Sequence, residues 1–341
     1  MNYETEWRKR MTDTLKSVAR RPDIKAYVEQ TPWLNRLLRR AAAQYVAGED
    51  RQEGLAVGRM LADMGYAVSL EYIGENTADA VECQTAAEEM KSLIREIGEI
   101  AGIRTGARVS FDLSHIGLSV ETQLAYRQLM ELAQEARGAG IELFISMEES
   151  TKTESILDVY RQTSAVYPNI GITLQAQLNR TAMDLAALSG SSRRIRIVKG
   201  AYQEPEALAM PRSLALDDRY LTLIQLAIHQ GHRVSIATHD ERIIGEVINR
   251  GWLDSGGVEF EMLYGIRPDL SARLQAEGYP IRIYVTYGHD WYLYLCHRIA
   301  EYPPNLYRAI VDMANEGAGH PFLAYEQKGS PLVKSYKASP S

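Results

Sequence analysis

Polar and ionisable residues follow eight short apolar runs of this sequence, at the points where the runs end. Such carboxylates, imidazoles, cations and tyrosines can bind charged ligands and move protons. In chain order they are Glu71, Tyr72 and Glu75; Asp112, Ser114 and His115; Glu148 and Glu149; Gln175, Gln177 and Arg180; Arg196, Lys199 and Tyr202; Thr238, His239 and Asp240; Glu261 and Tyr264; Tyr284 and Tyr287. They form one site if the runs are strands whose ends meet.

One of these strings has the chemistry of an anion site. Lys199 places a cation at the end of its run, and Gly200 follows it where a backbone can approach a ligand closely. A lysine beside a glycine suits a bound phosphate. By itself the string is a weak signal.

A metal-dependent hydrolase is a second class of enzyme that these residues could serve. Possible N and O ligands are Asp112, His115, Glu148, His239 and Asp240. The sequence has no His-x-His or His-Glu-x-x-His, however, and single histidines at separate strand ends are more often structural or cofactor contacts. We therefore predict no metal, and there is no serine nucleophile elbow.

The eight runs read as strands because they are short, apolar or β-branched, and separated by stretches long enough for helices. They span 66–72, 107–113, 141–147, 170–175, 194–199, 233–238, 258–263 and 281–286. Seven connections can hold a crossover helix, a clear example being 121–137, and an eighth helix can start at Trp291. Eight strand–helix units predict a (β/α)8 TIM-like barrel, with the active site at the carboxyl ends of the strands. A doubly wound open sheet is the alternative, but no Gly-x-Gly-x-x-Gly follows an early strand.

Residues before the first strand show only helical patterning. Trp7, Met11, Leu15 and Val18 have helical spacing, so 1–64 is predicted to be a helical N-terminal arm. The barrel is expected over 65–318. A tail over 319–341, which holds three prolines and a Ser/Lys-rich end, is expected to be flexible.

Composition excludes several classes of protein. The 341 residues are 45% apolar with a net charge of −6, and the basic residues are dispersed, which argues against disorder and against nucleic-acid binding. The sequence shows neither a leader pattern nor an apolar run of membrane-spanning length. Cys83 and Cys296 are the two cysteines, and the second is expected to be a small core residue on the last barrel helix. A reducing, cytoplasmic setting follows.

Several strings, in order along the chain, resemble the proline dehydrogenase family. The resemblance covers about 65–315 and is carried by 147–149 (MEE), 174–176 (LQA), 196–205 (RIVKGAYQEP), 237–240 (ATHD), 260–267 (FEMLYGIR), 282–288 (RIYVTYG) and 291–301 (WYLYLCHRIAE). It implies a distorted (β/α)8 barrel that holds FAD at the strand ends. The family transfers a hydride from the carbon next to an amine nitrogen to flavin N5.

The resemblance also implies roles for individual residues. FAD contacts are expected from Gln175, Arg196, Lys199, Gly200, Ala201, Thr238, His239 and Glu261. The substrate pocket is expected to be walled by Tyr202, Leu263, Tyr284 and Tyr294. For the tyrosines, core packing with a satisfied hydroxyl is the structural alternative. Arg196 is expected to stabilise the reduced flavin, so that Arg196→Met keeps the fold and slows flavin reduction.

The sequence departs from the family where the substrate carboxylate is held. The family's strand-two lysine is Asp112 here, and its pair of arginines reads His297 and Arg298, while Glu301, which orients that pair, is retained. Family residues are also replaced by Ser146, Gln177 and Thr286.

The departures bear on the substrate. Lysine to aspartate changes the local charge by two units, so we predict a small amine, amino acid or N–N-bonded substrate, in a biosynthetic pathway. Asp112 can accept hydrogen bonds from an ammonium, and His297 can pair with a carboxylate or take a proton from the amine. Ordinary oxidation of proline to pyrroline-5-carboxylate is the alternative, with Arg298 alone holding the carboxylate. A non-catalytic flavin-binding barrel is the third reading, and the electron acceptor stays open.

Overall fold

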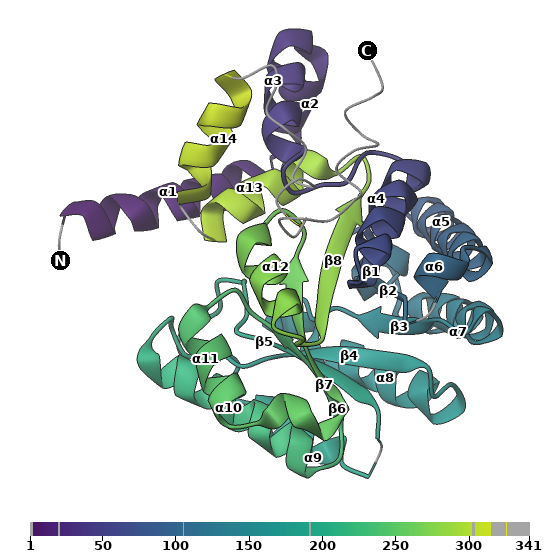
Figure 1. Ribbon diagram of the computed structural model, residues 1–341. Coiled ribbons are helices and arrows are strands. Elements are labelled where there is room, and N and C mark those ends of the chain that lie inside the picture. Colours follow the sequence, from purple (N-terminus) through teal and green to yellow (C-terminus); the bar gives the residue numbers. More distant parts are fainter. Residues whose placement is uncertain are drawn as a thin grey trace.

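The computed structural model shows eight parallel strands closed into a barrel in the order β1-β2-β3-β4-β5-β6-β7-β8 (Figure 1). It describes residues 3–19, 21–104, 106–190, 192–301, 304–314 and 325. The strands are β1 Ala67–Tyr72, β2 Arg108–Phe111, β3 Glu142–Ile145, β4 Ile170–Gln175, β5 Arg194–Val198, β6 Arg233–Ala237, β7 Val258–Leu263 and β8 Ile281–Tyr287. The predicted barrel is confirmed, and because β1 pairs with β8 the open-sheet alternative is wrong.

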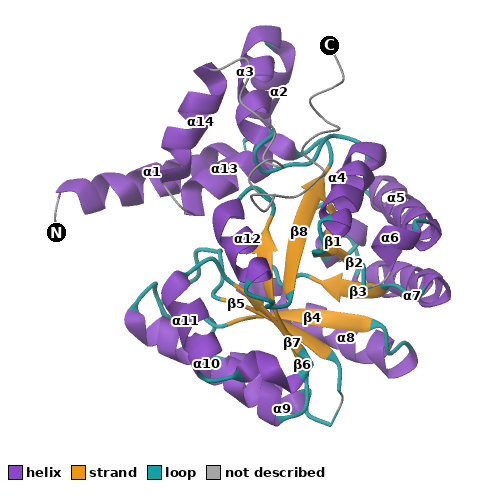
Figure 2. Ribbon diagram, viewed as in Figure 1, coloured by secondary structure: helices purple, strands orange, loops and turns teal. Residues whose placement is uncertain are grey.

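Helices connect the strands and cover the outside of the barrel (Figure 2). They are α5 Ala80–Glu99, α6 Ala101–Arg104, α7 Thr122–Ala139, α8 Thr153–Val166, α9 Thr181–Ala187, α10 Leu214–His229, α11 Glu241–Asn249 and α12 Pro268–Ala276. Short 3-10 turns occur at Leu113–Ile116, Ser150–Lys152 and Trp252–Ser255. Asp79, Ser213 and Asp240 cap α5, α10 and α11 by accepting backbone N–H bonds in the first turn.

Four helices precede β1, within the stretch 1–64 that the sequence analysis assigned to a helical arm: α1 Tyr3–Ala19, α2 Pro22–Gln30, α3 Pro32–Ala42 and α4 Arg51–Asp63. α4 differs from the other three, because it packs on β1 and β8 and its Leu55, Val57 and Leu61 belong to the barrel's apolar core. It fills the place that we predicted for the helix after β8.

That last helix, α13 Trp291–Glu301, packs elsewhere. It lies against α1 and α3, and α14 Pro304–Ala314 packs on α3 (Figure 1). Their side chains form a second apolar cluster, in which Cys296 is buried beside Tyr45 and Trp291. The expectation that Cys296 lies on a barrel helix is therefore corrected: α13 is a helix, but its apolar face belongs to the helical arm.

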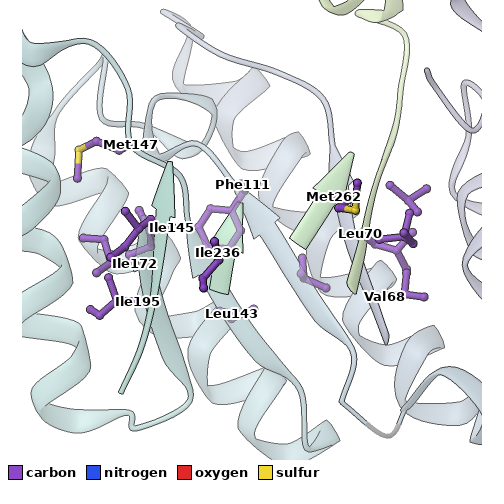
Figure 3. Packing of buried hydrophobic residues seen from close by; sticks show 14 of the residues in the cluster. Val68, Leu70, Phe111, Leu143, Ile145, Met147, Ile172, Ile195, Ile236 and Met262 are labelled. Carbon is purple, nitrogen blue, oxygen red and sulfur yellow. The ribbon is translucent and has the colours of Figure 1, made fainter. Parts of the chain in front are cut away.

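Side chains alternate along the strands between the two faces of the barrel wall. Apolar residues such as Leu70, Phe111, Ile145 and Ile236 are fully buried in the main apolar cluster (Figure 3). The positions between them are polar, and side chains of strands that are not neighbours bond to one another there, which is possible only inside the barrel. Thus Arg108 of β2 donates to Ser235 of β6 and to Glu259 of β7.

The barrel interior therefore contains a network of ion pairs. Glu259 also accepts from Arg282 at 3.1 Å, and Arg108 donates to Glu142 at 2.6 Å. Buried charges are stable only when they are paired and hydrogen-bonded, because desolvation costs each of them several kcal/mol. This network satisfies that condition across four strands, and it forms the base on which the strand ends rest.

Gly265, just after β7, joins the barrel to segments far away in the sequence. Its carbonyl accepts from the Gln44 side chain at 2.8 Å, and its N–H donates to the Tyr325 hydroxyl at 2.8 Å. The Tyr325 ring stacks on Tyr264 and is 1% exposed. Apart from Tyr325, the predicted tail 319–341 lies outside the described residues.

Gly265→Ala tests this junction. Gly265 has φ +75°, and a Cβ there would lie 1.7 Å from the Gln44 carbonyl oxygen. We expect a loss of about 3 kcal/mol or more in the free energy of unfolding, measured by denaturant titration. Gly256→Ala is the matched control, because Gly256 has φ +72° and no atom near its Cβ position, so about 1 kcal/mol is expected. Equal losses in both variants would contradict the packing at Gly265.

Candidate active site

A cavity of about 580 Å³ opens at the carboxyl ends of the strands. Of the sixteen predicted site residues, fifteen line it: Asp112, Gln175, Arg196, Lys199, Gly200, Ala201, Tyr202, Thr238, His239, Glu261, Leu263, Tyr284, Tyr294, His297 and Arg298. Glu301 ends α13 and is not among the lining residues, and the structure does not describe its side chain. The fold thus brings residues of the strand ends and of α13 together around one cavity. The role of each residue stays a prediction.

The floor of the cavity is a buried ion pair. Arg196 of β5 donates to both carboxylate oxygens of Glu261 of β7, at 2.9 and 2.7 Å. A further N–H of Arg196 donates to Ser110 at 2.9 Å, and the guanidinium carbon lies 4.8 Å from the centre of the Tyr284 ring. The nearby cation lowers the pKa of Glu261 although burial opposes this. Both charges are held rigidly at the base of the cavity.

Basic and donor groups gather on the side of β5 and β6. Lys199 pairs with Asp217, in the first turn of α10, at 2.5 Å. It also pairs with Asp240, which caps the start of α11, at 2.9 Å. Gly200 has φ +108°, a backbone geometry that favours glycine, and Arg212 donates to its carbonyl. Two cations beside the buried turn at Gly200 suit an anionic group such as a pyrophosphate.

His239 is a neutral donor on the same side. Its Nε2 accepts the N–H of Leu263 at 2.9 Å, which leaves the proton on Nδ1. Burial first, and then the charges of Arg298 and Arg267, lower the pKa of His239 to about 3. The ring therefore offers an uncharged N–H while it lines the cavity.

Acidic groups gather on the opposite side, at the ends of β1, β2 and β3. Glu71, Glu75, Asp112 and Glu149 line the cavity. Burial raises the pKa of Glu71 to about 7, although its hydrogen bond to Tyr284 and the charges of Arg196 and Arg298 act against the rise. Burial, and then the carboxylates of Glu148, Glu71 and Glu75, raise the pKa of Asp112 well above its usual range.

α13 and the tyrosines close the cavity above this floor. The Arg298 guanidinium lies over the Tyr294 ring, 4.7 Å from its centre, and His297 stands next to it. The Tyr202 carbonyl accepts from Gln177 at 3.2 Å, which fixes the loop after β5. Aromatic rings and a guanidinium around one space can hold a small ring with a charged substituent.

Some residues that the sequence placed in contact with a cofactor are already engaged. The Gln175 amide donates to the carbonyls of Met147 and Glu148 at 3.2 and 2.7 Å, so it ties β4 to the loop after β3. Thr238 accepts the N–H of Asp240 at 3.1 Å. The hydrogen bonds of Gln175 and Thr238 therefore hold the strand ends in place, and both side chains also line the cavity.

Sequence reasoning missed two basic residues of the site. Lys152 is not a lining residue, but it bonds Glu148 at 2.7 Å and the cavity-lining Glu149 at 3.0 Å; because 146–149 are not helical, no helical spacing indicates these pairs. Arg212 lines the cavity from a loop twelve residues beyond Gly200, and no sequence pattern indicates it.

The described part of the chain contains no group of three or more His, Cys, Asp or Glu side chains placed to hold a metal ion. None of its described helices combines the length and apolar character needed to cross a membrane.

Comparisons with known proteins agree with this geometry. The family profile described as proline dehydrogenase matches residues 55–305. The chain is 34% identical over 270 residues to proline dehydrogenase 1 of Bacillus subtilis, covering 78% of this chain and 88% of that protein. It is 33% identical over 297 residues to proline dehydrogenase of Deinococcus radiodurans, covering 85% and 93%.

Solved structures share the fold. A crystal structure of proline utilization A from Bdellovibrio bacteriovorus, inactivated by N-propargylglycine, superposes with a TM-score of 0.70 at 17% identity. The match covers 86% of this chain but 36% of that one, so the chain spans about a third of the larger protein. At this identity the likeness bears on the fold alone.

The buried ion pair corrects the expectation that Arg196→Met leaves the fold intact. Removing the guanidinium strands the Glu261 carboxylate in the barrel, with Arg108 as its next cation at 3.8 Å. We predict a loss of about 3 kcal/mol in the free energy of unfolding. The double variant Arg196→Met, Glu261→Met should recover much of it in a double-mutant cycle. Additive losses would show that the two side chains are not energetically coupled.

A second prediction concerns the His239 ring. With a pKa of about 3, it should remain neutral, with Nδ1 protonated, as the pH falls from 7 to 5. Nitrogen-15 NMR of histidine-labelled protein measures this directly, because the two ring nitrogens report tautomer and charge. Assignment uses the His239→Asn variant, in which the signal disappears. An imidazolium at pH 5 would contradict the predicted burial.

Proposed function

Because the chain belongs to the proline dehydrogenase family, we propose that it oxidises the CH–NH bond of a small amine of the proline class. It is an FAD-dependent oxidoreductase acting on a CH–NH bond. The relatives are named for proline, so ordinary proline oxidation, our alternative from the sequence, agrees with them at least as well as a changed amine. A biosynthetic role has no support in these comparisons and stays a prediction.

The distribution of charge across the cavity carries the proposal. The ends of β5 and β6 supply Arg196, Lys199 and the uncharged N–H of His239, with Asp240 paired to Lys199, whereas the ends of β1, β2 and β3 supply acidic side chains alone. In a closed eight-stranded barrel these arcs face each other across the mouth. One side therefore suits the phosphates of a dinucleotide and the other an ammonium, which are the two ligands that flavin-dependent amine oxidation needs.

The residues of the basic side fit FAD. Lys199 and Arg212 are placed for the pyrophosphate, beside the turn at Gly200 that lines the cavity. His239 would donate from Nδ1 to a ring acceptor, and Arg196 would place a fixed cation beneath the cofactor. When bound, FAD accepts a hydride from the amine.

The chain's own residues would orient the amine and handle its proton. Oxidation breaks a C–H bond, whose electron pair leaves with the hydride, and removes the N–H proton, so that a C=N bond forms. Glu71, whose pKa burial raises to about 7, would take up that proton on its way to solvent, and Asp112, whose pKa is also raised, would hydrogen-bond the amine. Tyr284, bonded to Glu71, and Leu263 would exclude water from the reacting carbon.

Arg298 would hold a carboxylate if the substrate carries one. It is the cation that α13 contributes to the cavity lining, and its guanidinium over Tyr294 presents N–H groups of fixed direction. Proline, with an ammonium and a carboxylate, could thus use the acidic side and Arg298 together. A carboxylate-free amine is the second candidate, favoured by Asp112, because no cation stands at that position to bind a carboxylate.

The test is anaerobic flavin bleaching. Protein loaded with FAD should be yellow and should lose its visible flavin absorbance when proline or pyrrolidine is added without oxygen. Arg298→Met should weaken the apparent affinity for proline about tenfold and leave that for pyrrolidine nearly unchanged, since only proline has a carboxylate. A colourless protein that takes up no FAD would refute the proposal. A yellow protein that no small amine bleaches would indicate the non-catalytic flavin-binding barrel.

A further inference from the structure

A β-turn follows β7 at the edge of the cavity, between Leu263 and Ile266. The N–H of Ile266 donates to the carbonyl of Leu263 at 3.1 Å, so Tyr264 and Gly265 are the two central residues. Gly265 has φ +75°, and Tyr264 does not belong to the described residues with positive φ. A positive φ at the second central residue alone defines a type II turn.

The alternative form of such a turn is one peptide rotation away. Types I and II differ in the direction of the central peptide, which in this turn joins Tyr264 to Gly265, and type I requires a negative φ at the second central residue. Glycine adopts either sign of φ, so Gly265 itself does not decide between the two forms. The groups that bond to the central peptide must select one of them.

The hydroxyl of Tyr325 is such a group. It accepts the N–H of Gly265, which belongs to the central peptide, at 2.8 Å. The Tyr325 ring stacks on Tyr264 with ring centres 5.9 Å apart and meets Tyr66 edge to face at 5.7 Å, so its direction is fixed. A rotated peptide would turn the Gly265 N–H away from this acceptor. A buried donor without its partner is costly, so the hydroxyl favours the type II form.

Two further hydrogen bonds hold the same turn. The amide of Gln44, in the segment between α3 and α4, donates to the carbonyl of Gly265 at 2.8 Å. The N–H of Tyr264 donates to the carbonyl of Tyr284 at 2.9 Å, which continues the pairing of β7 with β8 by one residue. Segments from both ends of the chain thus meet at one glycine.

The turn is connected to the side of the cavity that we assign to the cofactor. Its first residue, Leu263, lines the cavity and donates its N–H to Nε2 of His239 at 2.9 Å. Arg267 follows the turn directly, and its charge acts on the His239 ring. Rotation of the central peptide changes ψ of Tyr264 and φ of Gly265, and the residues on both sides move with it. The form of the turn therefore bears on how Leu263 meets His239.

We propose that Tyr325 is a positioning residue for the reaction: its hydroxyl holds the turn 263–266 in the type II form and so sets Leu263 and His239 in place against the flavin. This role presupposes the proposed amine oxidation and adds to it a residue near the other end of the chain. Tyr325 acts through the turn, since it is not among the residues that line the cavity.

Tyr325→Phe tests the hydroxyl alone, because phenylalanine keeps both ring contacts. Tyr66→Phe is the matched control: it removes the hydroxyl that donates to the Tyr325 carbonyl at 3.3 Å, and it leaves the acceptor of the Gly265 N–H in place. Gln44→Met is a second variant of the same turn, because it removes the donor to the Gly265 carbonyl. FAD content and circular dichroism confirm that each variant folds.

Two readouts separate positioning from a general loss of stability. In nitrogen-15 NMR, the Nε2 resonance of His239 should move to higher frequency in Tyr325→Phe and Gln44→Met, because this nitrogen then accepts a weaker hydrogen bond from Leu263. In anaerobic bleaching by pyrrolidine, the limiting rate should fall about fivefold in the same two variants, since hydride transfer depends steeply on geometry, while the apparent Kd changes less than about twofold. Neither readout should change in Tyr66→Phe.

The outcomes distinguish the positioning role from the proposed function. If the resonance and the limiting rate keep their wild-type values in Tyr325→Phe, or change equally in Tyr66→Phe, the positioning role is wrong while amine oxidation stands. A resonance that moves without any change in rate also overturns the role in the reaction. If neither proline nor pyrrolidine bleaches the wild type, amine oxidation fails, and the His239 resonance alone decides whether Tyr325 holds the turn. Both changes in Tyr325→Phe, absent from Tyr66→Phe, support both statements.

Discussion

The buried pair of Arg196 and Glu261 is the interaction on which the site depends. It joins β5 to β7 through the middle of a closed barrel, and both partners also line the cavity. Below it, Arg108, Glu259 and Arg282 continue the ionic interior. Such pairs contribute little net stability compared with apolar packing, but each fixes its partner's position, because an unpaired buried charge is costly. A fixed cation at the cavity floor is the consequence.

Two separated charge regions follow from the same topology. Strand order places β5 and β6 opposite β1 and β2, so Lys199 and Asp112 stand on different arcs of one cavity. α13, which leaves the barrel wall to pack with the helical arm, brings Arg298 over the space between them. The arm thus does more than cover an apolar surface: it holds the helix that completes the site.

Much of the fold was predictable, because β-branched runs of four to seven residues alternate with helical stretches, and each predicted strand lies within two residues of an observed one. The sequence did not predict that α4, rather than α13, packs on β1 and β8. Both helices are amphipathic, and only their packing in the fold decides which one covers the barrel. The Arg196–Glu261 pair was also missed, although RIRIV and VEFEML alternate polar and apolar residues, which is unusual for parallel strands buried on both faces. The resemblance of the motifs to the family identified the residues of the cavity wall. Which charged side chains lie close enough to pair could be known only from the three-dimensional structure.

The central claim is that one cavity holds FAD on its basic side and an amine on its acidic side. A crystal structure of the FAD-loaded chain with bound pyrrolidine, in the reduced state, tests it most directly. The account predicts the flavin ring above Arg196, the pyrophosphate near Lys199 and Gly200, and the amine nitrogen toward Glu71 and Asp112. Flavin density outside this cavity, or an amine nitrogen pointing away from both acids, would contradict it.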